Sequence, residues 1–160
     1  MNSTGTPSLF MHAADAIHGD LGMIQPKDVI ICISKSGNTP EIKVLVPLLK
    51  REGNPLIAIT ANRESFLATQ ANYVLYAYTQ KEACPNNLAP TTSTTAQLVM
   101  GDALSVALMR MKSFGSEDFA KYHPGGALGK RLYLTVGEAI ARNQVPSVAP
   151  DTDIRQVKIG

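Results

Sequence analysis

The chain has 160 residues, of which 44% are hydrophobic and 18% charged, and its net charge is +2. This length suits one compact domain with a real hydrophobic core, and the composition is that of a soluble globular protein. The 15 basic residues do not gather into the stripe that a nucleic-acid-binding surface needs. No apolar run reaches the roughly 18 residues that a membrane span needs. We therefore expect neither nucleic acid nor a membrane as a partner.

The chain shows no targeting or metal-binding pattern. Its N-terminus lacks the basic-then-apolar order of a signal peptide. The two cysteines, Cys32 and Cys84, form neither a C-x-x-C motif nor a Cys/His metal spacing. We expect two reduced thiols, a cytoplasmic protein and no bound metal.

Apolar runs and helical patterns alternate along the chain. Continuous apolar runs at 28–33 and 55–60 are typical of strands buried on both faces of a parallel sheet. The runs at 8–12 and 72–78 predict two more strands. Helices are predicted at 40–51, where the internal Pro47 should cause a kink or a tighter turn, and at 64–71, 96–112 and from Ser116, a cap-like serine. This order predicts an α/β fold with a parallel sheet.

The segment after the first continuous strand could hold an anion. It reads Ser34-Lys-Ser-Gly-Asn-Thr-Pro40. Gly37 permits backbone angles that other residues avoid, while Thr39 and Pro40 suit the N-cap and first position of a helix. The backbone N–H groups at such a helix start favour an anion, and three hydroxyls could add donors. A capped turn with solvated hydroxyls explains the same residues, so both interpretations stay open.

A second hydroxyl-rich segment, Thr91-Thr-Ser-Thr-Thr95, directly precedes the longest predicted helix. One such residue would suffice as an N-cap. The run could line a sugar or phosphate site, or it could be an ordinary Ser/Thr-rich turn.

Candidate acid/base residues are few. His18 and His123 lie on glycine-containing turns, where a histidine could transfer protons near neutral pH. Glu41 begins a predicted helix, where a carboxylate also suits the helix dipole, and Glu82 precedes a loop rich in Pro and Asn. Each alone would pass as structural, but together they fit proton transfer on a small phosphorylated substrate, or simple binding of one.

These residues also resemble those of a known family. Six ordered motifs accompany the Ser-x-Ser-Gly loop, and together they are similar to the sugar isomerase (SIS) domain of D-arabinose 5-phosphate isomerases. The resemblance runs from about residue 3 to 140. The motifs are Ser3-Thr-Gly-Thr-Pro-Ser8, His18-Gly-Asp-Leu-Gly-Met23, Lys81-Glu-Ala-Cys-Pro85, Leu88-Ala-Pro-Thr-x-Ser-Thr-Thr95, Met100-Gly-Asp-Ala-Leu104 and His123-Pro-Gly-Gly-Ala-Leu-Gly129.

The resemblance implies a fold and an activity. The fold is a three-layer α/β/α sandwich with a parallel sheet, of flavodoxin-like type. The activity is aldose–ketose isomerisation between D-ribulose 5-phosphate and D-arabinose 5-phosphate, which feeds the synthesis of Kdo, a sugar of lipopolysaccharide and capsules. It also implies no cofactor and a homotetramer with sites shared between subunits.

The resemblance also assigns roles to residues. It implies that the sugar phosphate is bound by Ser34, Ser36 and Thr39, with Lys35 lending its backbone, and by Thr92, Ser93, Thr94 and Thr95. It implies acid/base roles for His18, Glu41, Glu82 and His123, without ranking Glu82 against His123 as the base.

The sequence departs from the family at both ends. Family members carry a preceding strand that ends in a Gly-x-Gly-Lys-Ser loop, and that loop supplies a lysine and a serine to the site. We expect residues 1–133 to be a SIS domain that lacks this first strand, and 134–160 to be a linker and the start of a CBS region. Without that strand we expect little isomerase activity and poor solubility from this chain alone.

Two other functions fit the same residues. One is a non-catalytic module that senses a sugar phosphate, as in some SIS-containing transcription regulators. The other is an isomerase of a different phosphosugar, which the two His-containing motifs argue against.

Overall fold

The computed structural model describes residues 1–142, 151 and 153, and it divides the chain into two compact units. The first unit holds Met1–Asn2 and Thr6–Ser113, and the second holds Ser3–Gly5 and the described residues from Phe114 onward. The first unit thus ends before residue 133, where the end of the SIS domain is predicted. The predicted start of a CBS region falls largely on 143–150, 152 and 154–160, outside the described residues.

The first unit is built on a parallel sheet, as the sequence predicts. Its strands are β1 (Ile30–Ile33), β2 (Leu56–Thr60) and β3 (Tyr73–Tyr76), hydrogen-bonded in the order β1-β2-β3. The register places Cys32 of β1 beside Ala58 of β2 and Val74 of β3. The carboxyl ends of all three strands therefore lie side by side, at one end of the sheet.

The predicted strand at 8–12 is wrong. These residues form no regular element, and the side chains of Leu9 and Phe10 are 81% and 86% exposed. The physical reason is that an apolar run becomes a strand only by pairing, and the described sheet offers these residues no neighbouring strand.

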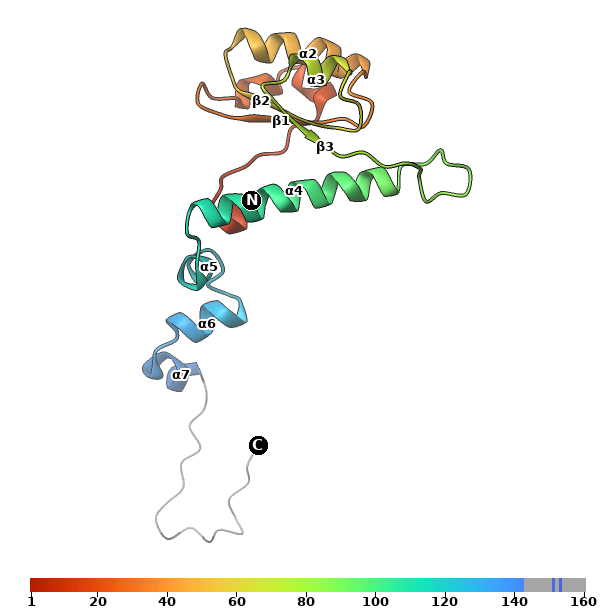
Figure 1. Ribbon diagram of the computed structural model, residues 1–160. Helices are drawn as coiled ribbons and strands as arrows, with labels where there is room; N and C mark the ends of the chain where they lie inside the picture. Colours follow the sequence, from red (N-terminus) through yellow and green to blue (C-terminus); the bar gives the residue numbers. More distant parts are fainter. Residues whose placement is uncertain (143–150, 152, 154–160) are drawn as a thin grey trace. The chain divides into compact units, whose positions relative to one another are not determined.

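Helices lie on both faces of the sheet. On one side are α1 (Ala13–Ala16), α2 (Pro40–Arg51) and α3 (Phe66–Gln70), and on the other is α4 (Thr92–Met111) (Figure 1). Two short 3-10 helices, η1 (Asn2–Thr4) and η2 (Asp20–Met23), precede β1. This is the predicted α/β/α arrangement.

Helix α2 tolerates its internal proline. It runs as one uninterrupted α-helix from Pro40 to Arg51, without the tighter turn that the sequence allowed. The exposed side of the helix carries Pro47, while the opposite side buries Ile42, Leu45, Val46 and Leu49. Burial of four aliphatic side chains offsets the hydrogen bond that a proline cannot donate.

The hydrophobic core lies on the α2 side of the sheet. Its members are Ala16, Cys32, Ile42, Leu45, Val46, Leu49, Leu56, Ala58 and Leu67. The expected burial on both faces is right for the central strand β2, but β1 is an edge strand whose Ile33 is exposed.

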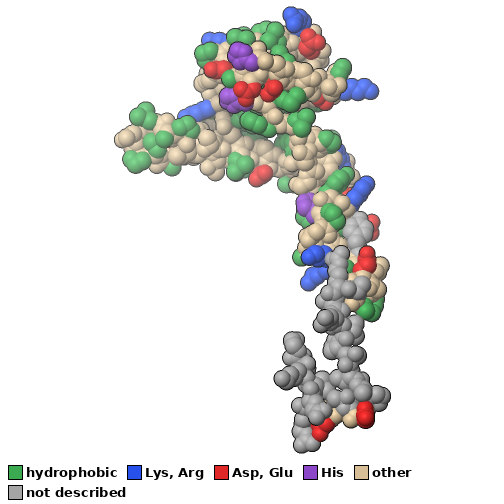
Figure 2. Space-filling view, turned by 180° about the vertical axis from the view of Figure 1, so that it is seen from behind, with side chains coloured by type: hydrophobic (Ala, Val, Ile, Leu, Met, Phe, Trp, Pro, Cys, Tyr) green, Lys and Arg blue, Asp and Glu red, His purple; other side chains and the backbone are tan. Residues whose placement is uncertain are grey.

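Helix α4 is mostly exposed. Ser93 is its one buried residue, and its Leu98, Val99 and Val106 are 66%, 59% and 61% exposed. Figure 2 shows such hydrophobic side chains at the surface of the molecule.

The second unit is helical in its described part. It contains α5 (Ser116–Tyr122), α6 (Ala127–Tyr133) and α7 (Val136–Arg142). Gly115, and not Ser116, occupies the N-cap position of α5, and its N–H donates to the carboxylate of Asp118 at 2.9 Å. The prediction of Ser116 as the N-cap was wrong by one position. The Asp118 carboxylate in the first turn accepts from the N–H of Gly115, and this contact makes Gly115 the N-cap residue.

Candidate functional site

The loop 34–39 leaves the carboxyl end of β1 and leads into α2. Its backbone is tied to the end of β2: the N–H of Ser34 donates to the carbonyl of Ile59 at 3.0 Å, and the carbonyl of Lys35 accepts from the N–H of Ala61 at 3.0 Å. The hydroxyl of Thr60 donates to the same Lys35 carbonyl at 3.1 Å. Ligands of parallel sheets bind outside this edge, so the loop lies where the fold favours a site.

Gly37 lets the loop lie against the loop that follows β2. Its φ is +65°, and a Cβ there would lie 2.2 Å from Oγ of Ser65 and 3.1 Å from Oγ1 of Thr60. Its carbonyl accepts from the N–H of Leu67 at 3.0 Å. Only glycine satisfies both the backbone angle and this close approach.

The start of α2 retains the means to bind an anion. Thr39 is the N-cap, as predicted, but its side chain makes no capping hydrogen bond. The first N–H groups of any α-helix lack partners inside the helix, and the helix dipole makes this end favourable for negative charge. Ser36, Thr39 and Glu41 are all exposed here, while the hydroxyl of Ser34 is used in accepting from the N–H of Gly37 at 3.1 Å.

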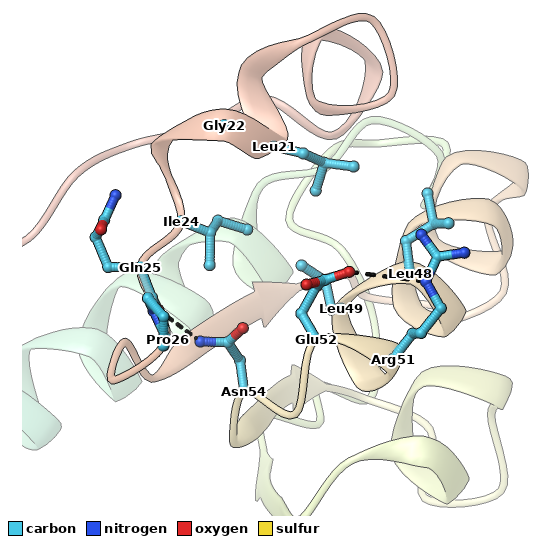
Figure 3. A pocket seen from close by; sticks show the side chains of 10 residues that line it. All are labelled: Leu21, Gly22, Ile24, Gln25, Pro26, Leu48, Leu49, Arg51, Glu52 and Asn54. Carbon is cyan, nitrogen blue, oxygen red and sulfur yellow. Dashed lines mark hydrogen bonds and ion pairs between the residues drawn. The ribbon is translucent and has the colours of Figure 1, made fainter.

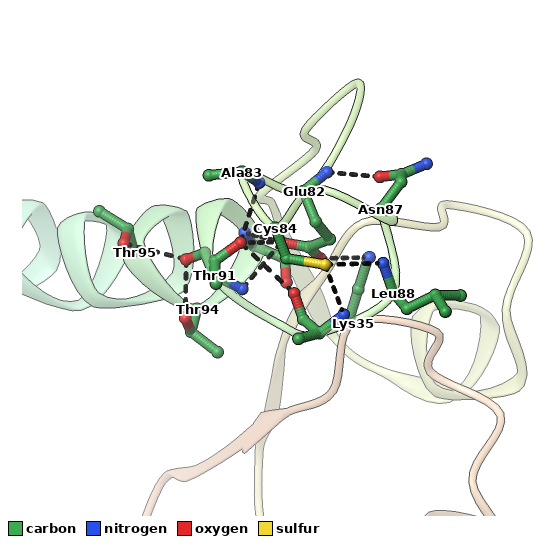
Figure 4. Close-up of polar contacts among 11 residues, drawn as sticks. Lys35, Glu82, Ala83, Cys84, Asn87, Leu88, Thr91, Thr94 and Thr95 are labelled. Carbon is green, nitrogen blue, oxygen red and sulfur yellow. Dashed lines mark hydrogen bonds and ion pairs between the residues drawn. The ribbon is translucent and has the colours of Figure 1, made fainter.

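Glu82 is the centre of the polar network in Figure 4. Its side chain is only 1% exposed, and its Oε1 accepts from Nζ of Lys35 at 2.5 Å. Its Oε2 accepts from the backbone N–H groups of Thr91 at 2.9 Å and Ser93 at 3.0 Å. The Lys35 ammonium, followed by Ser93 and the Thr91 N–H, holds the pKa of this carboxyl well below its usual range.

The hydroxyl run forms the first turn of α4. Thr94 and Thr95 both direct their Oγ1 to the carbonyl of Thr91, at 2.8 and 3.0 Å (Figure 4). Ser93 is buried, and Thr92 is half-buried. The hydroxyl protons of Thr94 and Thr95 are thus used within the helix, whereas their oxygens remain exposed as acceptors.

The two candidate histidines belong to other segments of the chain. His18 is exposed and follows α1, next to Gly19, whose φ is +141°. His123 is half-buried in the second unit, where its ring stacks on Phe119 with centroids 3.9 Å apart. Its Nδ1 lies 2.9 Å from the carbonyl oxygen of Phe119. A carbonyl can only accept, so Nδ1 carries a proton, and in the neutral ring Nε2 is then the nitrogen with the free lone pair.

The structure therefore brings together part of the predicted set. The Lys35–Glu82 contact joins the loop 34–39 to the start of α4, and Glu41 stands in the first turn of α2 behind that loop. Sequence reasoning missed two residues that build this arrangement. Ser65 caps α3 by accepting from the N–H of Ala68 at 3.2 Å, and Asn87 accepts from the N–H of Glu82 at 2.6 Å. A serine before an apolar helical pattern could have revealed the first.

A cavity of about 370 Å³ lies at the opposite end of the sheet, near the amino ends of β1 and β2 (Figure 3). It is lined by residues of η2, by the end of α2 and by the segment before β2, among them Leu21, Leu48, Arg51, Glu52 and Asn54. Asn54 uses its amide there to donate to the carbonyls of Gln25 and Asp28, at 2.9 and 3.0 Å. The cavity is therefore distinct from the polar network at the carboxyl ends of the strands.

Two features are absent from the part of the chain that the structure describes. No three His, Cys, Asp or Glu side chains within it gather closely enough to hold a metal ion. None of its helices has the length and apolar character needed to cross a membrane.

Comparison with known proteins gives consistent matches. The chain is 54% identical over 155 residues to the arabinose 5-phosphate isomerase KpsF of Escherichia coli, covering 97% of this chain and 49% of that protein. It is 53% identical over 154 residues to the arabinose 5-phosphate isomerase KdsD of Escherichia coli K12, covering 96% of this chain and 47% of that protein. The chain thus spans about half the length of these curated relatives.

Solved structures and protein families agree with these matches. A protein of E. coli CFT073, solved in complex with arabinose 5-phosphate, superposes with a TM-score of 0.73 at 46% identity, covering 77% of this chain and 65% of that one. The SIS domain family matches residues 1–107. With its parallel sheet and its Ser-x-Ser-Gly loop at the strand ends, the chain belongs to the SIS domain family.

Proposed function

We propose that this chain carries the phosphosugar-binding core of an aldose–ketose isomerase that interconverts D-ribulose 5-phosphate and D-arabinose 5-phosphate. The observation that carries the proposal is the loop 34–39, a hydroxyl-rich turn at the N-terminus of α2 and at the carboxyl edge of a parallel sheet. The names of the relatives, together with the arabinose 5-phosphate complex of one structural neighbour, support the choice of sugar.

The phosphate group is bound by Ser34, Ser36 and Thr39 with the free N–H groups of α2, and by the start of α4. The Thr92–Thr95 turn at the start of α4 also contacts the sugar itself, because the exposed oxygens of Thr94 and Thr95 accept hydrogen bonds from sugar hydroxyls. Anchoring the phosphate leaves the carbonyl end of the sugar to be positioned for proton transfer.

The reaction needs a base and a way to stabilise the enediolate. A base removes a proton from carbon 1 or carbon 2, and the proton returns to the neighbouring carbon. His18, Glu41, Glu82 and His123 are the candidate groups. His123 suits the role of base because the Phe119 carbonyl holds its Nδ1 proton and leaves Nε2 able to accept. Glu82 suits it less, since both of its oxygens already accept hydrogen bonds.

The setting of this reaction is also part of the proposal. The product supplies the synthesis of Kdo in the cytoplasm, and no cofactor takes part because the proton moves between two carbons of one substrate. The free thiols of Cys32 and Cys84 are consistent with a reducing compartment. The exposed aliphatic side chains of α4 suit a homotetramer whose subunits share sites.

The activity is tested in a chimera, because the chain spans about half of each relative. Residues 3–140 replace the matching segment of the E. coli KpsF relative, and conversion of ribulose 5-phosphate is followed by NMR. We expect turnover, and we expect H123A to lower kcat by about a hundredfold or more while the substrate still binds. The matched control is H12A, which removes an exposed histidine outside the candidate set. A chimera that binds the sugar phosphate without converting it would indicate a sensing module instead.

A further inference from the structure

We propose that the Lys35–Glu82 ion pair is a clamp that sets the spacing between the loop 34–39 and the first turn of α4. In this role Glu82 is a positioning residue for phosphate binding and not the base of the reaction. The inference rests on the proposed phosphate site, and it assigns to Glu82 a task different from proton transfer.

The first observation is that both oxygens of the Glu82 carboxylate already accept hydrogen bonds within the chain. Oε1 accepts from the Lys35 ammonium, while Oε2 accepts from two backbone N–H groups, those of Thr91 and Ser93. The hydroxyl of Thr91 also lies 3.3 Å from Oε2. A general base works best with a pKa near the operating pH, and these donors hold the pKa of Glu82 well below its usual range.

The second observation is that both ends of Lys35 are fixed. Its carbonyl oxygen accepts from the N–H of Ala61 and from the hydroxyl of Thr60, which ties the loop to the end of β2. Its side chain, 49% exposed, reaches Glu82. Lys35 therefore connects the end of β2 to Glu82 and to the residues that are hydrogen-bonded to Glu82.

The third observation is that Glu82 is rigidly joined to α4. Its N–H donates to Oδ1 of Asn87 at 2.6 Å, and the next N–H, of Ala83, donates to Oγ1 of Thr91 at 2.9 Å. Oε2 also accepts two hydrogen bonds from the start of α4, so the segment from Glu82 to Ser93 forms a loop held by its own hydrogen bonds (Figure 4). A displacement of Lys35 is thus passed on to the start of α4, and the two halves of the phosphate site keep one spacing.

The test measures phosphate affinity in the 160-residue chain by calorimetry, with inorganic phosphate and D-arabinose 5-phosphate as probes. We expect E82Q and K35M each to weaken binding by about tenfold, because each removes one charged partner of the clamp. The double variant E82Q/K35M should bind no worse than either single variant, since each single change already removes the ion pair. K35R keeps the positive charge and should retain affinity within about twofold.

The control pair is Arg51 and Glu52, an exposed ion pair of 3.7 Å at the other edge of the sheet. R51M and E52Q should leave affinity unchanged. A general loss of structure would lower the melting temperature without producing the non-additive pattern or the rescue by K35R, so these two readouts separate positioning from folding.

Several results would overturn the clamp. E82Q that binds as tightly as the parent chain, or additive losses in the double variant, would show that the pair does not set the site. If E82Q fails to fold, K35M with unchanged affinity has the same meaning. A chain that binds neither probe would refute the phosphate site as well. Normal probe binding and clamp behaviour, with a chimera that never isomerises ribulose 5-phosphate, would refute the proposed reaction alone.

Discussion

Single residues decide whether the loop 34–39 can form. Gly37 combines a positive φ with contact to Ser65, so a side chain there meets two separate penalties. Gly53 also has a positive φ, of +83°, but nothing lies within 4 Å of a Cβ built on it. The two glycines therefore separate the cost of the backbone angle from the cost of the collision.

We expect G37A to lower the free energy of unfolding by about 2–4 kcal/mol, of which about 1–2 comes from the backbone angle and the rest from overpacking. G53A should show only the first part. Urea denaturation of both variants measures the difference. Equal losses in the two variants would mean that the loop can move away from Ser65.

The two thiols should differ in reactivity. Burial raises the pKa of Cys32 to about 11, whereas the N–H groups of Leu88 and Ala89, each 3.2 Å from Sγ, lower the pKa of Cys84. A lowered pKa keeps the reactive thiolate populated at lower pH.

A disulfide reagent at neutral pH should therefore modify one thiol of the folded chain, and both after denaturation. The modification should persist to a lower pH than that of an unperturbed cysteine. Loss of this modification in folded C84S would identify Cys84 as the reactive thiol, with C32S as the control. Fast reaction of Cys32 in the folded chain would contradict the burial of β1.

Among the elements, α2 is predicted from the sequence with its observed bounds, 40–51. The apolar spacing and the Thr-Pro start are local signals, and both were sufficient there. The start of α4 lies at Thr92 instead of 96 because Glu82 satisfies the N–H groups of Thr91 and Ser93, a contact that no local pattern reveals. For the same reason the sequence identified Lys35 and Glu82 separately, but not their pairing.

Helix α2 also gives a prediction about Pro47. A proline inside a helix removes one backbone hydrogen bond and crowds the preceding turn. Because Pro47 is exposed, P47A should increase the free energy of unfolding by about 1–3 kcal/mol. K43A, at another exposed position of α2, should change it by less than about 0.5 kcal/mol. Destabilisation by P47A would mean that the rigidity of proline outweighs its cost to the helix.

For the whole molecule, the distribution of apolar surface is uneven. Leu98 and Val106 are exposed on α4, and Ile33 is exposed at the end of β1. These three side chains belong to the first unit, whose core lies on the other face of the sheet. Large apolar surfaces of this kind are typical of subunit contacts.

We therefore expect L98K and V106K to lower the molar mass measured by light scattering, as a proposed homotetramer separates. V44K, which replaces an exposed valine of α2, should leave the mass unchanged. A parent chain that is monomeric at every concentration would contradict this assembly.

The central claim is that the loop 34–39 and the start of α2 bind the phosphate of a sugar. An NMR titration of the isotope-labelled chain with D-arabinose 5-phosphate tests it most directly. The claim predicts that the largest shifts fall on the backbone amides of Ser36, Thr39 and Glu41, with S36A and T39A weakening the binding. Shifts confined to the cavity at Arg51, Glu52 and Asn54, or no shifts at all, would contradict it.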